Sequence, residues 1–250
     1  MEENFYSRTV ALIGATAYEK LTNSHVAIFG LGGVGGYVLE GLVRAGIGKI
    51  DIIDHDVISI TNFNRQILAT THSIGTKKTQ VAMERAKTIN PNIIINAHDD
   101  FLSPDTSFNY DFHSYDYVVD AVDTVTAKIE LVVQCNHAKT PIISCMGTGN
   151  KLDATAFQIA DLYSTSVCPL ARVMRRELKA RGINSLKVLF SKEPPKKGDF
   201  FLFSNDAILT NPPTIPEENI MRKIPPSSIS FVPSVAGLII AGEVIKDLIK

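Results

Sequence analysis

Four charged residues in this chain have the types and the order along the sequence that phosphate chemistry needs. Arg65 lies in an Asn-Arg-Gln run, Lys78 opens a helix-like segment, Asp123 ends an apolar run, and Arg8 lies near the N-terminus. Two guanidinium groups and an ammonium exceed what a dinucleotide requires. They suit a triphosphate, whose charge must be neutralised as pyrophosphate leaves. Because Mg²⁺ prefers oxygen ligands beside phosphates, Asp123 is the candidate magnesium ligand.

Each of these residues also has an ordinary structural explanation. Arg65 and Lys78 can be solvated surface charges, and Asp123 can stabilise the N-terminus of the helix that follows it. The set as a whole is harder to explain in this way, because all of its members are arranged in the expected order around one nucleotide-binding motif.

That motif is a glycine-rich turn between an apolar run at residues 25–29 and a helix-like segment. It reads Gly30-Leu-Gly32-Gly33-Val-Gly35. The glycines let the backbone approach a phosphate, and the next helix directs its N-terminal N–H groups at that charge. Asp54 ends the second apolar run, where a carboxylate can bind a ribose hydroxyl. A dehydrogenase would show the same pattern, so the motif predicts a nucleotide without identifying it.

The elements that must position these residues predict an α/β fold with a Rossmann-like, doubly wound and mostly parallel sheet. The expected strands are 25–29, 49–53, 93–95, 117–123 and 141–145, and the expected helices are 33–46, 75–89 and 124–138. Ligands of such sheets bind at the carboxyl ends of the strands. Gly30, Asp54 and Asp123 all fall at such ends, which agrees with the prediction from the glycine motif.

The second half predicts an irregular extension to this sheet. Its expected elements are a strand at 151–160, a basic helix at 169–181, a strand at 186–190, a proline-rich and partly mobile surface excursion at 194–226, and a helix at 232–249. Charged residues interrupt the last helix, so we expect it to be buried or interfacial rather than to span a membrane.

Composition restricts the classes of protein that need consideration. The chain has 250 residues and a formal net charge of −1, so no global positive field indicates nucleic acid, although a local patch would suffice. Three cysteines are too few for a disulfide framework or a four-thiolate zinc site. The N-terminus lacks the pattern of a signal peptide. We therefore expect a cytoplasmic protein.

As a set, the motifs resemble those of the ubiquitin-activating-type adenylating enzymes, which activate carboxylates with ATP. The residues that carry the resemblance are Gly30-x-Gly32-Gly33-x-Gly35, Asp54-x-Asp56, Asn62-x-Asn64-Arg65-Gln66, Gly75-x-x-Lys78, Asn90-Pro91 and Asp120-Ala-x-Asp123. The resemblance implies ATP and Mg²⁺ as cofactors. It implies that Asp54 binds the ribose, that Arg65 and Lys78 bind phosphates, and that Asp123 holds magnesium.

The resemblance also implies further site residues and an assembly. The implied nucleotide-binding set is Gly30, Gly32, Gly33, Gly35, Asp54, Asp56, Asn64, Arg65, Gln66, Lys78 and Asp123, and the implied catalytic set is Arg65, Lys78, Asp123 and Arg8. Arg8 would reach into the partner subunit's site, which implies a homodimer. Residues 1–250 would form a single adenylation domain, made of an N-terminal helical arm (1–24), a nucleotide-binding core (25–150) and a substrate-side extension (151–250).

Within that family, the second half is similar to the tRNA threonylcarbamoyladenosine dehydratases at segments 161–178 and 228–237. The N-terminal segment 8–14 is similar to them too. This similarity implies a tRNA substrate and an ATP-dependent dehydration through a carboxyl-adenylate. The basic helix then supplies candidate RNA contacts at Arg172, Arg175, Arg176 and Lys179, although a solvated helix face explains these charges equally well.

Two other functions stay open at this point. The chain could activate a ubiquitin-like sulfur-carrier protein by the same adenylation, but the paired Cys-x-x-Cys motifs of such activators are absent. It could instead be an NAD-dependent oxidoreductase or a nucleotide-binding regulatory module, which Arg65, Lys78 and Asp123 argue against.

The cysteines raise a separate question of sulfur chemistry. Cys168 precedes Pro169 at an expected helix start, where a thiol can be activated, but we favour a buried and inert cysteine. Cys135 and Cys145 are expected in the core. The sequence leaves open whether Cys168 takes part in sulfur transfer, so a cysteine desulfurase or a sulfur-carrier protein stays a further candidate partner.

Overall fold

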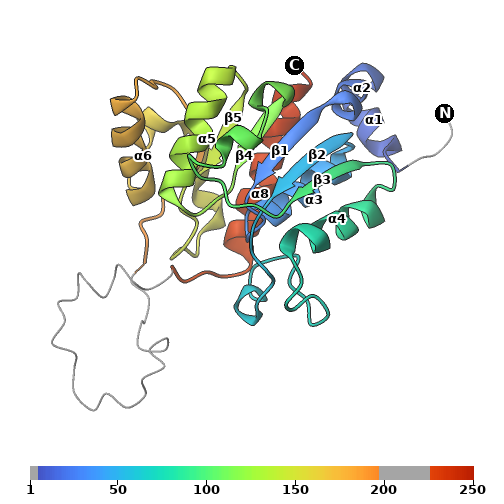
Figure 1. Cartoon of the computed structure of the whole chain (residues 1–250), viewed down its shortest axis with the longest axis horizontal. Helices are drawn as coiled ribbons and strands as arrows, with labels where there is room; N and C mark the ends of the chain where they lie inside the picture. Colours follow the sequence, from blue (N-terminus) through green and yellow to red (C-terminus); the bar gives the residue numbers. More distant parts are fainter. Residues whose placement is uncertain (1–4, 197–225) are drawn as a thin grey trace, which may run out of the picture.

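The computed structural model describes residues 5–196 and 226–250, and its centre is a seven-stranded sheet with helices on both faces (Figure 1). The strand order is β3-β2-β1-β4-β5-β7-β6, and only β6 runs antiparallel to its neighbour. The strands are β1 (His25–Phe29), β2 (Lys49–Ile53), β3 (Ile94–His98), β4 (Tyr117–Asp120), β5 (Ile142–Cys145), β6 (Phe157–Asp161) and β7 (Lys187–Ser191). This confirms the Rossmann-like, mostly parallel fold.

The helices of the described residues divide between an N-terminal pair and two covering layers. They are α1 (Ser7–Ile13), α2 (Ala15–Asn23), α3 (Gly35–Ala45), α4 (Lys78–Ile89), α5 (Val125–Ala138), α6 (Pro169–Ala180) and α8 (Phe231–Leu248). Val26 and Ile28 of β1 belong to the core beneath α3, α4 and α8, whereas Ala27 and Phe29 belong to the core beneath α5. Both faces of a parallel sheet are buried in this way, which explains why the strands read as continuous apolar runs.

The C-terminal helix α8 returns to pack on α3, beside the glycine-rich turn (Figure 1). Small residues allow the close approach: a Cβ at Gly237 would lie 2.5 Å from the carbonyl oxygen of Val34, and one at Gly41 would lie 2.7 Å from the Cβ of Ala241. The buried helix predicted at 232–249 is therefore confirmed at Phe231–Leu248. Among the described residues, no helix is both long and apolar enough to cross a membrane.

Several predicted boundaries differ from the structure for local reasons. The fourth strand ends at Asp120, because its carboxylate accepts the N–H of Val122 and the chain turns there. Helix α4 starts at Lys78 rather than at residue 75, because Gly75 has a φ of 80° and Lys77 pairs with Val57 in an isolated bridge. The third strand is Ile94–His98 rather than 93–95.

The extension also differs from its prediction. The strand expected at 151–160 is present only as β6, because residues 154–156 form a 3-10 turn. The basic helix predicted at 169–181 and the strand predicted at 186–190 are confirmed as α6 and β7, to within one residue. Most of the proline-rich segment predicted at 194–226 lies outside the described residues.

Candidate nucleotide-binding site

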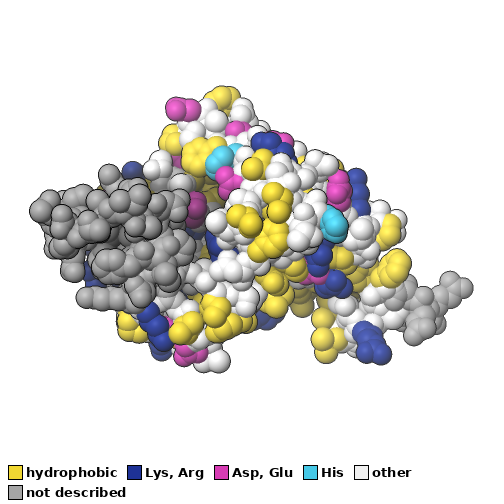
Figure 2. Space-filling model, turned by 90° about the horizontal axis from the view of Figure 1, so that it is seen from below, with side chains coloured by type: hydrophobic (Ala, Val, Ile, Leu, Met, Phe, Trp, Pro, Cys, Tyr) yellow, Lys and Arg dark blue, Asp and Glu magenta, His cyan; other side chains and the backbone are white. Residues whose placement is uncertain are grey.

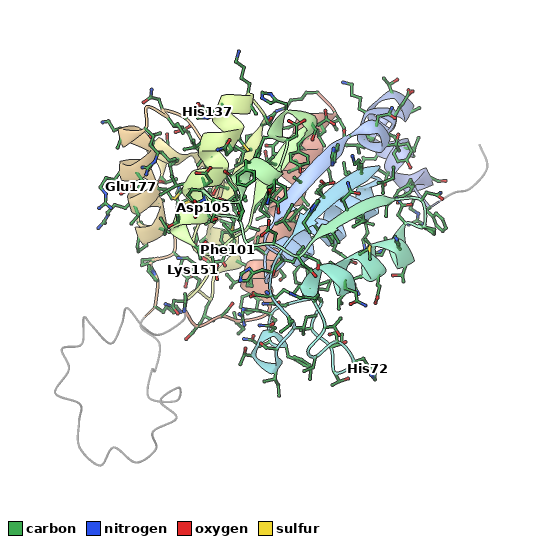
Figure 3. All side chains as sticks on the ribbon, viewed as in Figure 1. His72, Phe101, Asp105, His137, Lys151 and Glu177 are labelled. Atoms are coloured by element: carbon green, nitrogen blue, oxygen red, sulfur yellow. The ribbon has the colours of Figure 1, made fainter. Side chains whose placement is uncertain are left out.

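A cavity of about 440 Å³ opens at the carboxyl ends of β1, β2, β4 and β5. It is lined by most of the predicted site residues, namely Gly30, Gly32, Gly33, Asp54, Asp56, Arg65, Gln66, Lys78 and Asp123. These come from five segments of the chain that the parallel sheet brings to one edge. Phe101 from the segment after β3 adds an aromatic wall, and Figure 3 shows it near the ends of the central strands.

The glycine-rich turn is held so tightly that two of its positions admit no side chain. Gly30 has a φ of 91°, and a Cβ at Gly35 would lie 1.8 Å from the carbonyl oxygen of Gly30. Gly32 differs from both, because a Cβ there would meet no atom within 4 Å although the residue lines the cavity. The protein itself therefore does not require glycine at position 32, and the open space beside it suits a ligand that approaches the backbone.

Asp54 joins the second strand to this turn. Its Oδ2 accepts the backbone N–H of Leu31 at 2.6 Å, and its Oδ1 accepts that of Asp56 at 2.8 Å. Asp54 is 8% exposed. The carboxylate thus fixes the shape of the turn, while its role in binding ribose stays a prediction.

Lys78 supplies a cation that is almost fully buried at the start of α4. Its Nζ lies 2.7 Å from Asp56 Oδ2 and 3.7 Å from Asp54 Oδ1. Burial alone would raise the pKa of Asp56, but the hydrogen bond and the charge of Lys78 outweigh burial and lower that pKa. The ammonium is therefore held at the cavity wall by carboxylates, within reach of a phosphate.

The Asn-Arg-Gln run follows a 3-10 turn at Ile60–Asn62 in the loop between β2 and α4. The Arg65 guanidinium donates to the carbonyl oxygen of Thr61 and to Asn64 Oδ1, both at 2.9 Å, and no described carboxylate pairs with it. Its charge is therefore available to an anion. Asn64 does not line the cavity: its Nδ2 donates to the carbonyl oxygen of Ser228, so it orders the loop.

Gln66 has the only buried side-chain oxygen or nitrogen of the described residues that lacks a hydrogen-bond partner. The atom is Oε1, on a side chain that lines the cavity. Because an unsatisfied buried polar atom costs free energy, this atom indicates a ligand that supplies the missing partner.

Asp123 and the segment 54–56 offer two sets of carboxylates for a metal ion. Asp123 is exposed on the cavity wall, and no described residue forms an ion pair with it. Asp54, His55 and Asp56 have ligand atoms within 4.8 Å of one another, but Lys78 is already bonded to Asp56. The oxygen of Asp123 is thus the better match to a magnesium ion beside phosphates.

Some of the residues that line the cavity were not predicted from the sequence. They are Lys128, Phe101, Cys145, Pro233 and the Gly147-Thr-Gly149 segment after β5. A glycine pair directly after a predicted strand was a usable signal for the last of these. The sequence carries no such signal for Lys128, because a lysine inside a helix is expected to be solvated. It carries none for Pro233 either, because the N-terminus of α8 is far from the other lining residues in sequence.

The remaining predicted residues lie outside the cavity lining. Gly35 lies behind the turn, and Arg8 is exposed on α1 without a contact to the cavity of its own chain. On α6, Arg172, Arg176 and Lys179 are exposed, whereas Arg175 is half-buried and donates to the carbonyl oxygen of Thr165.

All three cysteines are free and buried. Cys168 is the residue before α6 and is 4% exposed, which confirms the expected burial. Burial raises the pKa of the Cys145 thiol to about 12, and it also raises the pKa of Cys135. Neither of these two thiols is a ready nucleophile.

Comparisons with known proteins agree with this geometry. The model of the ThiF family matches residues 6–250. The chain is 40% identical over 250 residues to a Bacillus subtilis protein named tRNA threonylcarbamoyladenosine dehydratase, covering 98% of this chain and 94% of that protein. The crystal structure of E. coli tRNA N6-threonylcarbamoyladenosine dehydratase in complex with ATP has a TM-score of 0.84 at 30% identity, covering 97% of this chain and 93% of that one. In contrast, an Ogataea parapolymorpha protein named adenylyltransferase and sulfurtransferase is 42% identical over 104 residues, which cover only 42% of this chain and 26% of that protein.

Fold and cavity together define a nucleotide-binding protein of the adenylating, Rossmann-like class. The match over nearly the whole length makes the assignment specific: the chain belongs to the ThiF family.

Proposed function

We propose that this chain catalyses the ATP-dependent dehydration of N6-threonylcarbamoyladenosine in tRNA. The observation that carries the proposal is the 40% identity over 98% of the chain to a protein named for that reaction. The similarity extends through β6, β7 and α8, beyond the glycine turn that many nucleotide-binding proteins share. The sulfur-carrier activator is the weaker alternative, because the relative named for sulfur transfer matches less than half of the chain.

The reaction begins with a carboxylate, which is a poor electrophile. The carboxylate of the modified adenosine attacks the α-phosphorus of ATP, which forms an acyl-adenylate and releases pyrophosphate. A nitrogen or oxygen of the same modification then attacks the activated carbonyl, AMP leaves and a ring closes. The carboxylate oxygen that leaves with AMP accounts for the water lost from the RNA.

The residues of the cavity contribute positioning and charge stabilisation. Arg65 and Lys78 would stabilise the charge that develops on the phosphates, and Asp54 would bind the ribose while it holds the turn. Asp123 would hold Mg²⁺, whose chemistry is to neutralise the triphosphate and the departing pyrophosphate.

We further propose a homodimer in which Arg8 completes the partner subunit's site. Two exposed apolar residues of the N-terminal arm support it, since Phe5 is 78% and Leu12 is 85% exposed. Ile60, in the loop beside the cavity, is 73% exposed, and Figure 2 shows apolar side chains beside lysines and arginines on the face that is seen from below. Burial of these side chains in a dimer would remove apolar surface from water.

The RNA would approach along α6. Leu170 of this helix lines the cavity, so the exposed Arg172, Arg176 and Lys179 lie on an element that borders the site. A tRNA-modifying enzyme of this kind would act in the cytoplasm as a single adenylation domain. A cysteine desulfurase or sulfur-carrier partner has no support beyond the three buried thiols, and we do not assign one.

Mass spectrometry of tRNA nucleosides tests the proposed reaction. Purified protein is incubated with threonylcarbamoyl-modified tRNA, with and without Mg-ATP. Loss of one water from the modified adenosine, only with ATP, is the expected result. Unchanged nucleosides together with ATP binding would shift the acceptor to a protein carrier, and capture of a Gly-Gly-terminated carrier would then identify it.

A further inference from the structure

A buried ion pair lies directly beneath the wall of the cavity. Lys128 of α5 is 1% exposed, and Asp120 at the end of β4 is fully buried. The Lys128 Nζ donates to Asp120 Oδ1 at 3.0 Å, to Asp120 Oδ2 at 3.1 Å and to the carbonyl oxygen of Cys145 at 2.7 Å. An ammonium has three protons to donate, so all of them have acceptors within the protein. Lys128 lines the cavity, but it has no donor left for a ligand.

The same carboxylate is bonded to the turn that follows β4. Asp120 Oδ1 accepts the backbone N–H of Val122 at 3.2 Å, and Asp120 Oδ2 accepts the hydroxyl of Ser144 on β5. The cluster of Lys128, Asp120 and Ser144 therefore ties the end of β4, the end of β5 and the first turns of α5 together. Residues 121–124, which these elements enclose, line the cavity and include Asp123.

The opposite side of this turn is closed by the glycine-rich turn. A Cβ at Gly30 would lie 2.7 Å from the carbonyl oxygen of Ala121, and one at Gly35 would lie 3.3 Å from the Cβ of Ala121. The backbone at Ala121 thus packs against the glycine-rich turn on one side, and Asp120 holds it on the other side. Asp123 is exposed and has no ion-pair partner among the described residues, so its place depends on this backbone.

We propose that Lys128 is a positioning residue for Asp123, the magnesium ligand. Lys128 holds the carboxylate of Asp120 in place, and that carboxylate fixes the N–H of Val122, the residue before Asp123. The proposal rests on the assignment of Mg²⁺ to Asp123 made above. Without the ammonium, Asp120 would be a buried carboxylate with no cation, which the interior tolerates poorly. The side chain would then turn from its present place and release the N–H of Val122. Groups that orient a metal ligand typically change metal affinity by about 10–100-fold when they are removed.

Amide hydrogen exchange of the protein without nucleotide or metal tests the first half of the proposal. In Lys128→Met we expect the Val122 amide to exchange about tenfold faster than in the wild type, because it loses a fixed acceptor. Lys187→Met is the matched control, since Lys187 also pairs with an aspartate, Asp247, but lies at the amino end of β7. It should leave the Val122 amide unchanged. Equal exchange of Val122 in Lys128→Met and the wild type would overturn the proposal.

Magnesium titrations of ATP binding test the second half. A fluorescent ATP analogue is bound at increasing Mg²⁺ and constant ionic strength, and the midpoint in Mg²⁺ is compared. We expect Lys128→Met to raise this midpoint by about 10–100-fold, and Lys187→Met to leave it within about twofold of the wild type. If the midpoint stays at the wild-type value in Lys128→Met, Lys128 has a structural role only.

Two more variants keep these outcomes distinct. Asp123→Asn should raise the midpoint as well; if it does not, the magnesium assignment itself fails, whatever Lys128 does. Lys128→Met/Asp120→Leu removes both buried charges and also the acceptor of the Val122 N–H, and it guards against loss of the fold. We expect this double variant to melt near the wild type but to keep the raised Mg²⁺ midpoint. A wild-type midpoint in the folded double variant would overturn the proposal.

Discussion

The carboxylate of Asp54 accepts the backbone N–H of Leu31 at 2.6 Å, so the end of β2 is tied to the glycine-rich turn after β1. A residue expected to bind ribose thus also shapes the phosphate-binding backbone. Because its second oxygen accepts the N–H of Asp56, the same side chain also holds the segment that pairs with Lys78.

Loss of this carboxylate should therefore weaken ATP binding both through the ribose contact and through the shape of the turn. We expect Asp54→Ala to cost about 2–3 kcal/mol of ATP affinity, since hydrogen bonds to charged groups contribute about 1.5–3 kcal/mol each. Calorimetric titration with ATP measures the loss. Asp105→Asn, which removes an exposed carboxylate outside the cavity lining, is the control (Figure 3). An affinity for ATP equal to that of the wild type in Asp54→Ala would contradict both roles.

The two glycines at positions 35 and 32 should respond differently to the same substitution. Gly35→Ala places a Cβ against the carbonyl oxygen of Gly30, so we expect it to lower the free energy of unfolding by about 1–3 kcal/mol or more. Gly32→Ala meets no protein atom, so its stability should be unchanged, while ATP affinity falls by about tenfold, or about 1.4 kcal/mol. Urea unfolding and ATP titration of both variants separate the two effects. Undiminished ATP binding in Gly32→Ala would show that no ligand occupies this space.

Gln66→Leu should stabilise the free protein while reducing its response to ATP. The substitution removes the unsatisfied Oε1, whose burial costs about 1–3 kcal/mol, so the melting temperature without ligand should rise by about 2–4 °C. The further rise on adding ATP should shrink, because the ligand loses a hydrogen-bond partner. Thermal shift assays with and without ATP measure both quantities. Gln80→Leu, on the exposed face of α4, should change neither. A lower melting temperature with an intact ATP response would refute the proposed contact.

The basic residues of α6 should separate into RNA contacts and structural contacts. Arg172→Glu and Lys179→Glu should each weaken tRNA binding and reduce the slope of log affinity against log salt by about 1. Arg175→Ala should mainly lower thermal stability, because this guanidinium bonds the turn at Thr165. Filter binding at several salt concentrations gives the slopes. If tRNA binding is indifferent to Arg172→Glu, α6 is a solvated helix face.

Asp247 should make folding stability depend on pH in the acid range. Burial alone would raise its pKa, but hydrogen bonds from Lys187, Lys250 and Tyr117 lower it to about 2. The folded pKa lies below the ordinary value of 3.8, so the stabilisation is complete above about pH 4 and is lost as the pH falls towards 2.

The substitution Asp247→Asn tests this dependence. It should destabilise the protein at pH 7, and the difference from the wild type should disappear near pH 2. Urea unfolding between pH 2 and 7 measures it, with Asp105→Asn as the exposed control. A constant difference across that range would show that the charge of Asp247 is not the cause.

The sequence by itself determined the local elements of the nucleotide site. The glycine-rich turn, the strand before it and Asp54 after the next strand lie within 30 residues, and their pattern follows from backbone sterics and the apolar runs of a doubly covered sheet. The positions of Lys78 and Asp123 at the cavity were predictable for the same reason, since Lys78 starts a helix and Asp123 lies just after a strand. Arg65 lies in the long loop after β2, and its place followed from the Asn-Arg-Gln motif. The charges of Arg65, Lys78 and Arg8 favoured a triphosphate over a dinucleotide, and the family resemblance then pointed to adenylation.

Tertiary structure decided what depends on contacts between distant segments. Asn64 bonds to Ser228, 164 residues away, so it orders a loop instead of lining the cavity. Pro233 of α8 reaches the glycine-rich turn because small residues let α8 pack on α3. Lys128 reads as a surface lysine in its helix, yet Asp120 and the carbonyl oxygen of Cys145 hold it in the interior. A side chain's burial depends on which elements pack around it, and no local pattern in the sequence states that.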